Sequence, residues 1–263
     1  VFLAGSFVRM TGSGMGCPDW PKCFGYLIPP TSEEQITWKP NTSFEEGMII
    51  VKDEALYVAE HPITTGETFN IDTWEKYTKH DYAKFNKYHT WIEYINRLTT
   101  VVLGIVALFL LVSAFLNRKE NRWIFPLALG TFFLILVEAI LGKIVVDTNL
   151  KPTIITLHMI LGLIIIGLVL RLRFIIAEKK TIYTYHALFN KLLIISVIFS
   201  LAQIAMGTQV RQFIDEQVKL YGFDNKQYSL MDPNWKFYFH RSFTIAIVMV
   251  NFGMYYLNKL HDL

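Results

Sequence analysis

The feature that most constrains this chain is a set of long apolar segments that carry almost no charge. Five such segments occur, at residues 98–117, 123–142, 152–170, 192–210 and 242–258. Only Glu138 and His158 interrupt them with an acidic or basic side chain. A helix needs about 20 apolar residues to cross the roughly 30 Å hydrocarbon core of a bilayer. The sequence therefore predicts five complete spans in an all-α integral membrane helical bundle.

The composition excludes several other classes of protein. Hydrophobic side chains make up 52% of the 263 residues and the mean hydropathy is +0.33, which is too apolar for an ordinary soluble domain. With two cysteines, the chain is not a secreted protein whose fold is held together by many disulfides. The net charge of +3 is small, and no Lys/Arg cluster is interleaved with aromatic residues. A lipid bilayer is the expected surrounding, and nucleic acid is not a partner.

Lysine and arginine concentrate in two of the links between spans. The link after the first span holds Arg118, Lys119 and Arg122. The link after the third span holds Arg171, Arg173, Lys179, Lys180 and Lys191. Cytoplasmic loops carry such an excess of basic residues, so both links are predicted to be cytoplasmic. The long loop at about 10–92 then lies on the outer side. Its segment 33–87 has few apolar runs and is predicted to be mostly irregular.

The chain also shows similarity between its own halves. Residues 4–9 realign with 206–211, and residues 93–97 realign with 237–241, in the same order and at the same predicted face. Internal repeats of this kind are typical of membrane proteins built from duplicated bundles. The sequence therefore predicts a pseudo-repeat of two four-helix units.

The two predicted units differ in completeness. Residues 1–8 are apolar and close on Arg9, but they are less than half a span, so we interpret them as the outer end of a partial first helix. The first unit is assigned to residues 1–174. Residues 175–263 supply the first two helices of a truncated second unit, so the sequence is expected to be a fragment whose missing helices carry a further histidine.

Two histidines lie near the predicted outer ends of apolar helices. An ionisable side chain in lipid is costly unless it faces the bundle interior, and helical bundles bind haem through histidines on facing helices. We therefore predict that His158 and His240 are ligands of haem iron. An alternative stays open, in which His158 bonds a neighbouring carbonyl and His240 lies in the interface beside Arg241.

Asn96 and Glu93 lie one helical turn apart at the start of the first complete span. The repeat predicts a histidine at Asn96, and an amide is a poor iron ligand. A haem site in the first unit would then have His158 as its one axial imidazole and an open iron position, which a reactive haem needs. Glu93 is predicted to donate or accept a proton or a hydrogen bond, or to be a helix N-terminal carboxylate favoured by the helix dipole.

Cys17 and Cys23 bracket a short segment on the predicted outer side. Because the exterior is oxidising, a disulfide is predicted. A loop this small is either a structural staple or a redox-active pair, and both interpretations stay open. Two thiols without a nearby histidine do not make a metal site.

The remaining polar groups of the spans have two interpretations each. Arginines mark the outer helix ends at Arg9, Arg97, Arg211 and Arg241, where they either reach for the interface or pair with haem propionates. Glu138 makes either an interhelical hydrogen bond as a protonated carboxyl or part of a proton path.

Several of these motifs resemble a known family. Residues 5–23, Gly-Ser-Phe-Val-Arg-Met-Thr-Gly-Ser-Gly-Met-Gly-Cys-Pro-Asp-Trp-Pro-Lys-Cys, resemble the first-helix and outer-loop signature of the haem A synthase family. Residues 93–97, Glu-Tyr-Ile-Asn-Arg, resemble its Glu-Tyr-x-His-Arg box. Residues 141–142 and 156–158, Leu-Gly and Thr-Leu-His, resemble its third and fourth helices. The resemblance runs to about His240 and excludes the long insertion in the outer loop.

The resemblance implies an eight-helix membrane enzyme of two four-helix halves. Such an enzyme oxidises the C8 methyl of haem O to the formyl of haem A, which haem-copper oxidases use. The first half takes haem O as substrate and the second binds haem b as cofactor. Carried onto this sequence, the substrate haem faces His158, Asn96 and Arg97, the cofactor is bound by His240 and Arg241, and the catalytic carboxylate is Glu93.

The resemblance also implies a location and partners. The protein is expected in the bacterial plasma (inner) membrane, with the Cys17 and Cys23 pair and the long loop outside. Its expected partners are haem O, the haem O synthase that supplies it and an unidentified electron donor, and a homo-oligomer is left open. Two other functions remain: a b-type membrane cytochrome, against which Asn96 argues because it lacks an imidazole, and a non-enzymatic assembly factor that holds haem.

Overall fold

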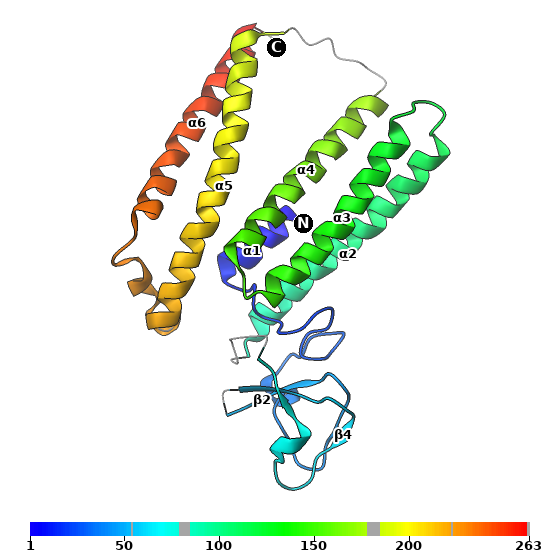
Figure 1. Cartoon of the computed structure of the whole chain (residues 1–263), viewed down its shortest axis with the longest axis vertical. Helices are drawn as coiled ribbons and strands as arrows, with labels where there is room; N and C mark the ends of the chain where they lie inside the picture. Colours follow the sequence, from blue (N-terminus) through cyan, green and yellow to red (C-terminus); the bar gives the residue numbers. More distant parts are fainter. Residues whose placement is uncertain (54, 79–84, 178–184, 222, 262–263) are drawn as a thin grey trace. The chain divides into compact units, whose positions relative to one another are not determined.

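The computed structural model describes residues 1–53, 55–78, 85–177, 185–221 and 223–261 (Figure 1). The chain divides into two compact units, Val1–Leu150 and Lys151–Leu263, which are described here one at a time. The predicted repeat boundary at residue 174 concerns sequence similarity, and it stays a prediction. Lys179 and Lys180, two of the residues used to orient the chain, lie outside the described residues.

Among the described residues, five helices are long and apolar enough to cross a membrane, which confirms the predicted all-α membrane bundle. They are α2 (Lys87–Leu116), α3 (Ile124–Asp147), α4 (Pro152–Ile176), α5 (Ala187–Tyr221) and α6 (Trp235–His261). Most of these helices extend beyond their charge-free segments, because polar residues continue a helix past the hydrocarbon core.

Local signals in the sequence explain where several helices begin and end. The short helix α1 (Phe2–Thr11) stops at Gly12, whose φ of 71° is the left-handed conformation that glycine adopts without strain. The Asn86 side chain accepts hydrogen bonds from the first backbone N–H groups of α2. Pro152 begins α4, at a position where its missing N–H costs nothing.

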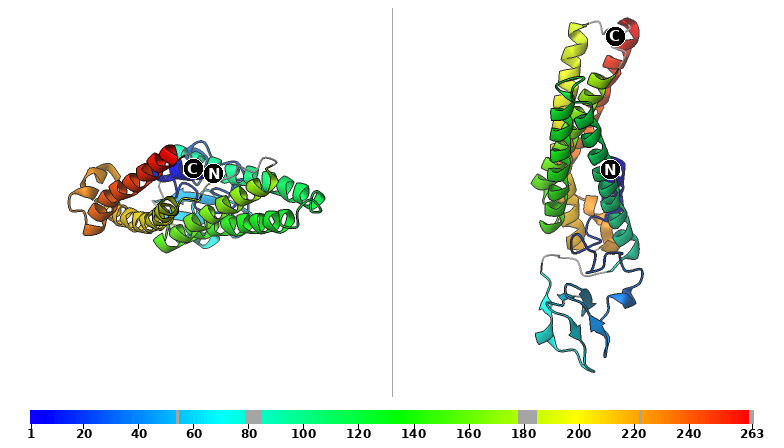
Figure 2. Two further views of the ribbon diagram at one scale, coloured as in Figure 1. Left: turned by 90° about the horizontal axis from the view of Figure 1, so that it is seen from above. Right: turned by 90° about the vertical axis from the view of Figure 1, so that its right-hand side faces the viewer.

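In the first unit, α2 and α3 pack together, and the chain before α2 forms a small β-containing segment beyond the start of that helix (Figures 1 and 2). Strands β1 (Ser43–Phe44) and β4 (Ile63–Thr64) pair in one antiparallel sheet. Strands β2 (Ile49–Lys52), β3 (Ala55–Val58) and β5 (Glu75–Lys76) form a second sheet in the order β2-β3-β5. The single-turn helix η1 (Glu33–Gln35) precedes the first strand, and η2 (Ile71–Thr73) lies between β4 and β5.

The prediction that segment 33–87 is mostly irregular holds by residue number, because strands and single-turn helices take up fewer than half of its described residues, but the two small sheets of the segment were not predicted. Its strands are two to four residues long, which is too short for the alternation of apolar and polar residues that reveals a strand. Two clusters of buried side chains hold the segment together. Ile36, Ile49 and Leu56 belong to one cluster, and Phe44 and Trp74 to the other.

In the second unit, α5 packs against both α4 and α6. The hydroxyls of Thr156 on α4 and Thr208 on α5 lie 2.7 Å apart, and Ser196 on α5 donates to Asn251 on α6 at 3.2 Å. Such interhelical hydrogen bonds satisfy polar groups inside a membrane span. The repeat predicts that α5 closes at Arg211, but the helix continues to Tyr221, and Arg211 pairs with Asp215 one turn later at 2.9 Å.

Candidate functional site

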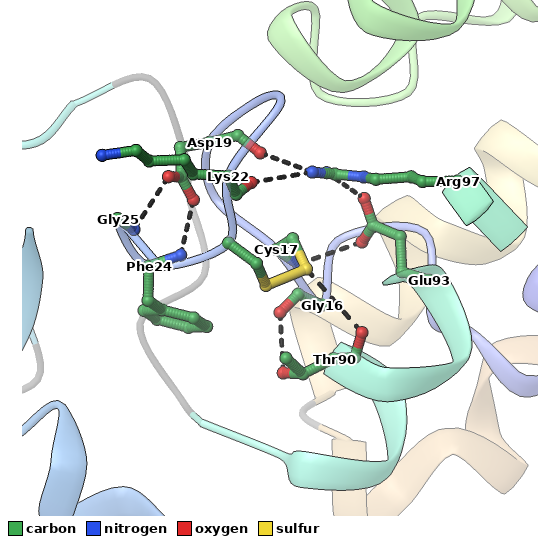
Figure 3. The surroundings of a disulfide bond; sticks show 10 residues. Gly16, Cys17, Asp19, Lys22, Phe24, Gly25, Thr90, Glu93 and Arg97 are labelled. Carbon is green, nitrogen blue, oxygen red and sulfur yellow. Dashed lines mark hydrogen bonds and ion pairs between the residues drawn. A yellow bond between two sulfur atoms is a disulfide. The ribbon is translucent and has the colours of Figure 1, made fainter. Parts of the chain in front are cut away.

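The first candidate site is the disulfide loop, residues 17–23, together with the start of α2 (Figure 3). Cys17 and Cys23 form a disulfide, which confirms the predicted pairing. Both cysteines have 0% of their surface exposed, so the bond lies inside the protein and not on its surface. This burial favours the structural interpretation of the pair over free exchange with external thiols.

The chain reaches this disulfide through a close backbone contact at Gly16. A Cβ atom on Gly16 would lie 2.5 Å from the carbonyl carbon and oxygen of His89 and 2.7 Å from the nitrogen of Thr90. Only glycine permits this approach of the loop to the first turns of α2. The Thr90 hydroxyl then donates to the carbonyl oxygen of Gly16 at 2.8 Å, which fixes the loop on the helix.

Glu93 and Arg97 hold the disulfide loop from one face of α2. The backbone N–H of Cys17 donates to Oε2 of Glu93 at 3.0 Å, and Nη2 of Arg97 lies 2.5 Å from the other carboxylate oxygen. The second terminal nitrogen of Arg97 donates to the carbonyl oxygens of Asp19 and Lys22 at 2.8 and 2.9 Å. The Glu93 side chain is 5% exposed and that of Arg97 14%, so both charges are buried and paired.

Asp19 organises the far side of the same loop. Its two carboxylate oxygens accept hydrogen bonds from the backbone N–H groups of Phe24 and Gly25 at 2.6 and 2.8 Å. Burial raises the pKa of Asp19, because desolvation outweighs the opposing effect of these hydrogen bonds and of the nearby Arg97 charge. The loop is therefore fixed at both ends through its backbone.

Asn96 lies on α2 between the two residues of this ion pair. Its Oδ1 atom is buried and has no hydrogen-bond partner among the residues that the structure describes. A buried polar atom without a partner is uncommon and is often satisfied by a bound group. The structure thus leaves this amide available at the position where the repeat predicts a histidine.

The second unit contains both predicted haem histidines. His240 lies on α6, and a Cβ atom on Gly207 of α5 would be 3.0 Å from its Cε1 atom, so the imidazole packs against the glycine. The amide of Gln203 donates to the His240 carbonyl oxygen at 3.0 Å and to the Thr244 hydroxyl at 2.7 Å, which fixes α6 against α5. The Nδ1 atom of His240 is buried and unpartnered within the described ranges.

His158 lies on α4, half-buried, two residues after the Thr156 hydroxyl that contacts α5. Arg241 is exposed beside His240, and its guanidinium lies over the Phe237 and Tyr238 rings at 5.9 and 5.6 Å. The structure thus brings Glu93, Arg97 and the cysteines together in one unit, and it places both histidines in the other.

Comparison with known proteins decides the family. Residues 1–52 and 62–260 match the family model described as cytochrome oxidase assembly protein (COX15-CtaA). The chain belongs to this family. It is also 24% identical over 209 residues to a heme A synthase of Shewanella oneidensis, which covers 79% of this chain and 51% of that relative. The chain thus spans about half the length of the curated relative that it matches. No solved structure matches.

The match to the cytochrome oxidase assembly family covers more of the outer loop than the sequence resemblance predicted. Only residues 53–61 of the loop lie outside it. These residues contain β3, which forms the centre of the three-stranded sheet, and Ala59, which is fully buried. The segment that departs from the family model therefore completes the three-stranded sheet of this member.

Sequence reasoning missed several residues that shape the two sites. Gly16, Asp19 and Thr90 hold the disulfide loop, and Gly207 packs against His240. Gln203 is not among them, because the repeat aligns it loosely with Glu138 as a polar position that faces another helix, and it does bond the His240 carbonyl on α6. Thr90 lies three residues before Glu93 and therefore on the same helix face, which was the one available signal. The contacts of Gly16 and Gly207 depend on tertiary packing, which residue spacing does not encode.

Proposed function

We propose that this chain forms part of a haem A synthase, which oxidises the C8 methyl of haem O to a formyl group by successive hydroxylations. Membership of the cytochrome oxidase assembly family supports this proposal, and so does similarity to a protein named heme A synthase. The motif of residues 5–23 and the Glu-Tyr-Ile-Asn-Arg box agree with it.

The observation that carries the proposal is the environment of His240. Its Nδ1 atom is buried without a partner among the described residues, and its ring rests against Gly207. An imidazole inside a helical bundle is the donor that haem iron accepts, so these residues fit haem b. When bound, haem b supplies one-electron transfer to the substrate. His240 would be the residue of this chain that holds haem b, and His158 would face haem O.

Glu93 is the acid–base residue of the proposal. Its two oxygens are engaged by Arg97 and by the Cys17 N–H, so the carboxylate is held at a fixed position. It would exchange a proton with substrate at the oxygen that one of these bonds releases. Arg97 uses its donors on the disulfide loop, which leaves the exposed Arg241 as the better partner for a haem propionate.

The cellular setting belongs to the same proposal. The protein would lie in the bacterial inner membrane, with the disulfide loop and the β-containing segment on the outer side. A haem O synthase would supply the substrate, and a separate donor would supply electrons. A homo-oligomer is compatible with this arrangement.

One observation favours a second candidate function. Both oxygens of Glu93 are occupied within the protein, as expected if this residue only holds the loop and the chain is a haem-handling assembly factor. The b-type cytochrome gains no such support, since Asn96 stands where a second imidazole would be needed.

Extraction of haems tests the proposal. The intact protein is expressed with a haem O synthase in cells that make no haem A, and extracted haems are identified by chromatography and mass. We expect haem A in the extract from cells that express the wild-type protein. In His240→Ala, we expect both haem A and haem b to be lost. His261→Ala, at an exposed position on the same helix, serves as the control. Bound haem without haem A would favour the assembly factor, and a colourless protein would exclude both functions.

A further inference from the structure

Three side chains on one face of α2 contact the disulfide loop. Thr90, Glu93 and Arg97 are spaced three and four residues apart, which places them on the same side of a helix. Each bonds the loop, or the Gly16 that precedes it, through backbone atoms (Figure 3). The interaction therefore depends on the path of the loop backbone and not on its side chains.

The disulfide restricts that backbone path. The carbonyls of Asp19 and Lys22, which accept from Arg97, lie within the ring that the disulfide closes. The N–H of Cys17, which donates to Glu93, is attached to the Cα atom at which this ring begins. Opening the disulfide would leave these groups on a flexible segment and would weaken all three bonds together. Arg97 connects the disulfide loop to Glu93, because it bonds both the loop carbonyls and the Glu93 carboxylate.

Burial also makes reduction of the disulfide depend on the Glu93–Arg97 pair. Neither cysteine is exposed, and both pack against Ile36, Ile49 and Leu56 as well as lying beside α2, so a reductant reaches the sulfur atoms only when the loop lifts from α2 or from this cluster. Lifting the loop breaks the Cys17 bond to Glu93 and the Arg97 bonds to the loop carbonyls. The Glu93–Arg97 pair therefore opposes reduction of the disulfide.

We propose that Arg97 and the disulfide loop form a clamp that positions the Glu93 carboxylate, and that this clamp links the position of Glu93 to the redox state of the Cys17–Cys23 bond. The inference rests on the proposed function in one respect, since there Glu93 is the acid–base group. Arg97 is a positioning residue in this arrangement, because it acts through Glu93 and the loop.

The redox step balances with an external dithiol. A thiolate of dithiothreitol attacks one cysteine sulfur and breaks the sulfur–sulfur bond, and its second thiol resolves the mixed disulfide. The reductant loses two electrons and becomes a cyclic disulfide. Cys17 and Cys23 gain those electrons and two protons and become thiols.

The first test measures how fast the disulfide is reduced in the intact protein. Dithiothreitol is added to protein in lipid nanodiscs, and new thiols are alkylated and counted by mass. Glu93→Gln and Arg97→Gln are each expected to speed reduction by about tenfold or more, because each removes buried charge-assisted hydrogen bonds. Arg97→Lys keeps the charge but has one nitrogen in place of the two terminal nitrogens that separately bond the loop carbonyls and the Glu93 carboxylate, so an intermediate rate is expected.

Asp147→Asn is the matched control. It breaks the Lys143–Asp147 pair, which has the same four-residue spacing on a neighbouring helix of the same unit but is about half exposed. Its reduction rate should stay within about twofold of wild type. Equal rates in wild type, Glu93→Gln and Arg97→Lys, with helical circular dichroism unchanged, would overturn the clamp.

The second test measures the coupling from the disulfide to the loop. Trypsin cleaves after Lys22, whose carbonyl oxygen is bound by Arg97. Cleavage at this bond should rise by about tenfold when wild type is reduced, and it should also rise in oxidised Glu93→Gln. Unchanged cleavage in both cases would contradict the proposal. Neither test needs haem, so a failure of the haem A assay and a failure of the clamp are separate results.

Discussion

Gly16→Ala should release the disulfide loop from α2, and the structure gives the size of the effect. A Cβ at this position would lie 2.5 Å from the His89 carbonyl, where ordinary contacts begin at 3.4 Å. The loop must therefore retreat by about 0.9 Å, because the obstacle is helix backbone that cannot move aside. A retreat of this size stretches the Thr90–Gly16 and Cys17–Glu93 hydrogen bonds, now 2.8 and 3.0 Å, beyond bonding distance.

The two bonds set the expected free energy. A neutral hydrogen bond contributes about 1 kcal/mol and one to a charged group about 1.5 to 3 kcal/mol, so the free energy of local opening should fall by about 3 kcal/mol. A change of that size raises the open population by roughly a hundredfold. We expect hydrogen–deuterium exchange of the loop amides to accelerate accordingly in the intact protein in nanodiscs.

Gly66→Ala is the control for Gly16→Ala. Gly66 lies in the same unit and a Cβ there meets no atom within 4 Å in the described part of the chain. Its exchange rates should match those of wild type. If Gly16→Ala and Gly66→Ala exchange alike, the backbone contact does not hold the loop, and the reasoning from steric overlap fails.

Three further predictions concern the residues at the proposed haem sites. Gly207→Ala should displace the His240 imidazole by a few tenths of an ångström and therefore shift the Soret and electron paramagnetic resonance signals of bound haem. Gly253→Ala is the control and should shift neither signal, because the atom nearest to its Cβ would lie 4.0 Å away. Gln203→Ala should lower haem b content, measured by the pyridine haemochrome assay, by about tenfold, because it removes the hydrogen bond that fixes α6 to α5 at His240. Asn96→His should supply a second imidazole to the substrate iron, give a low-spin spectrum and abolish haem A formation.

Most of the membrane architecture could be predicted from the sequence. Charge-free segments located all five spans, because the bilayer imposes a length and a polarity that few other folds require. The disulfide could be predicted from two cysteines in a loop that the charge pattern assigns to the exterior. The ends of the helices were less predictable, as α5 shows: it passes Arg211 because the Arg211–Asp215 pair lets polar residues continue the helix.

The contacts that define the sites could not be predicted in the same way. Glu93 and Arg97 were recognised as a motif, but their use of the loop backbone depends on how Gly16 packs against α2. Asp19 was read only as part of a family signature, although it holds two backbone N–H groups. Sequence spacing reports which residues share a helix face, and it does not report which distant backbone groups that face meets.

The two glycines paired by the predicted repeat have different surroundings, and this difference bears on the two proposed haem roles. The repeat pairs Gly5 with Gly207 and Asn96 with His240. The imidazole of His240 fills the space beside Gly207, whereas a Cβ on Gly5 would meet nothing within 4 Å among the described residues. An asparagine side chain is shorter than an imidazole and leaves its Oδ1 buried without a partner. A filled position suits a histidine held as a permanent ligand, and an open one suits a site that admits and releases a substrate.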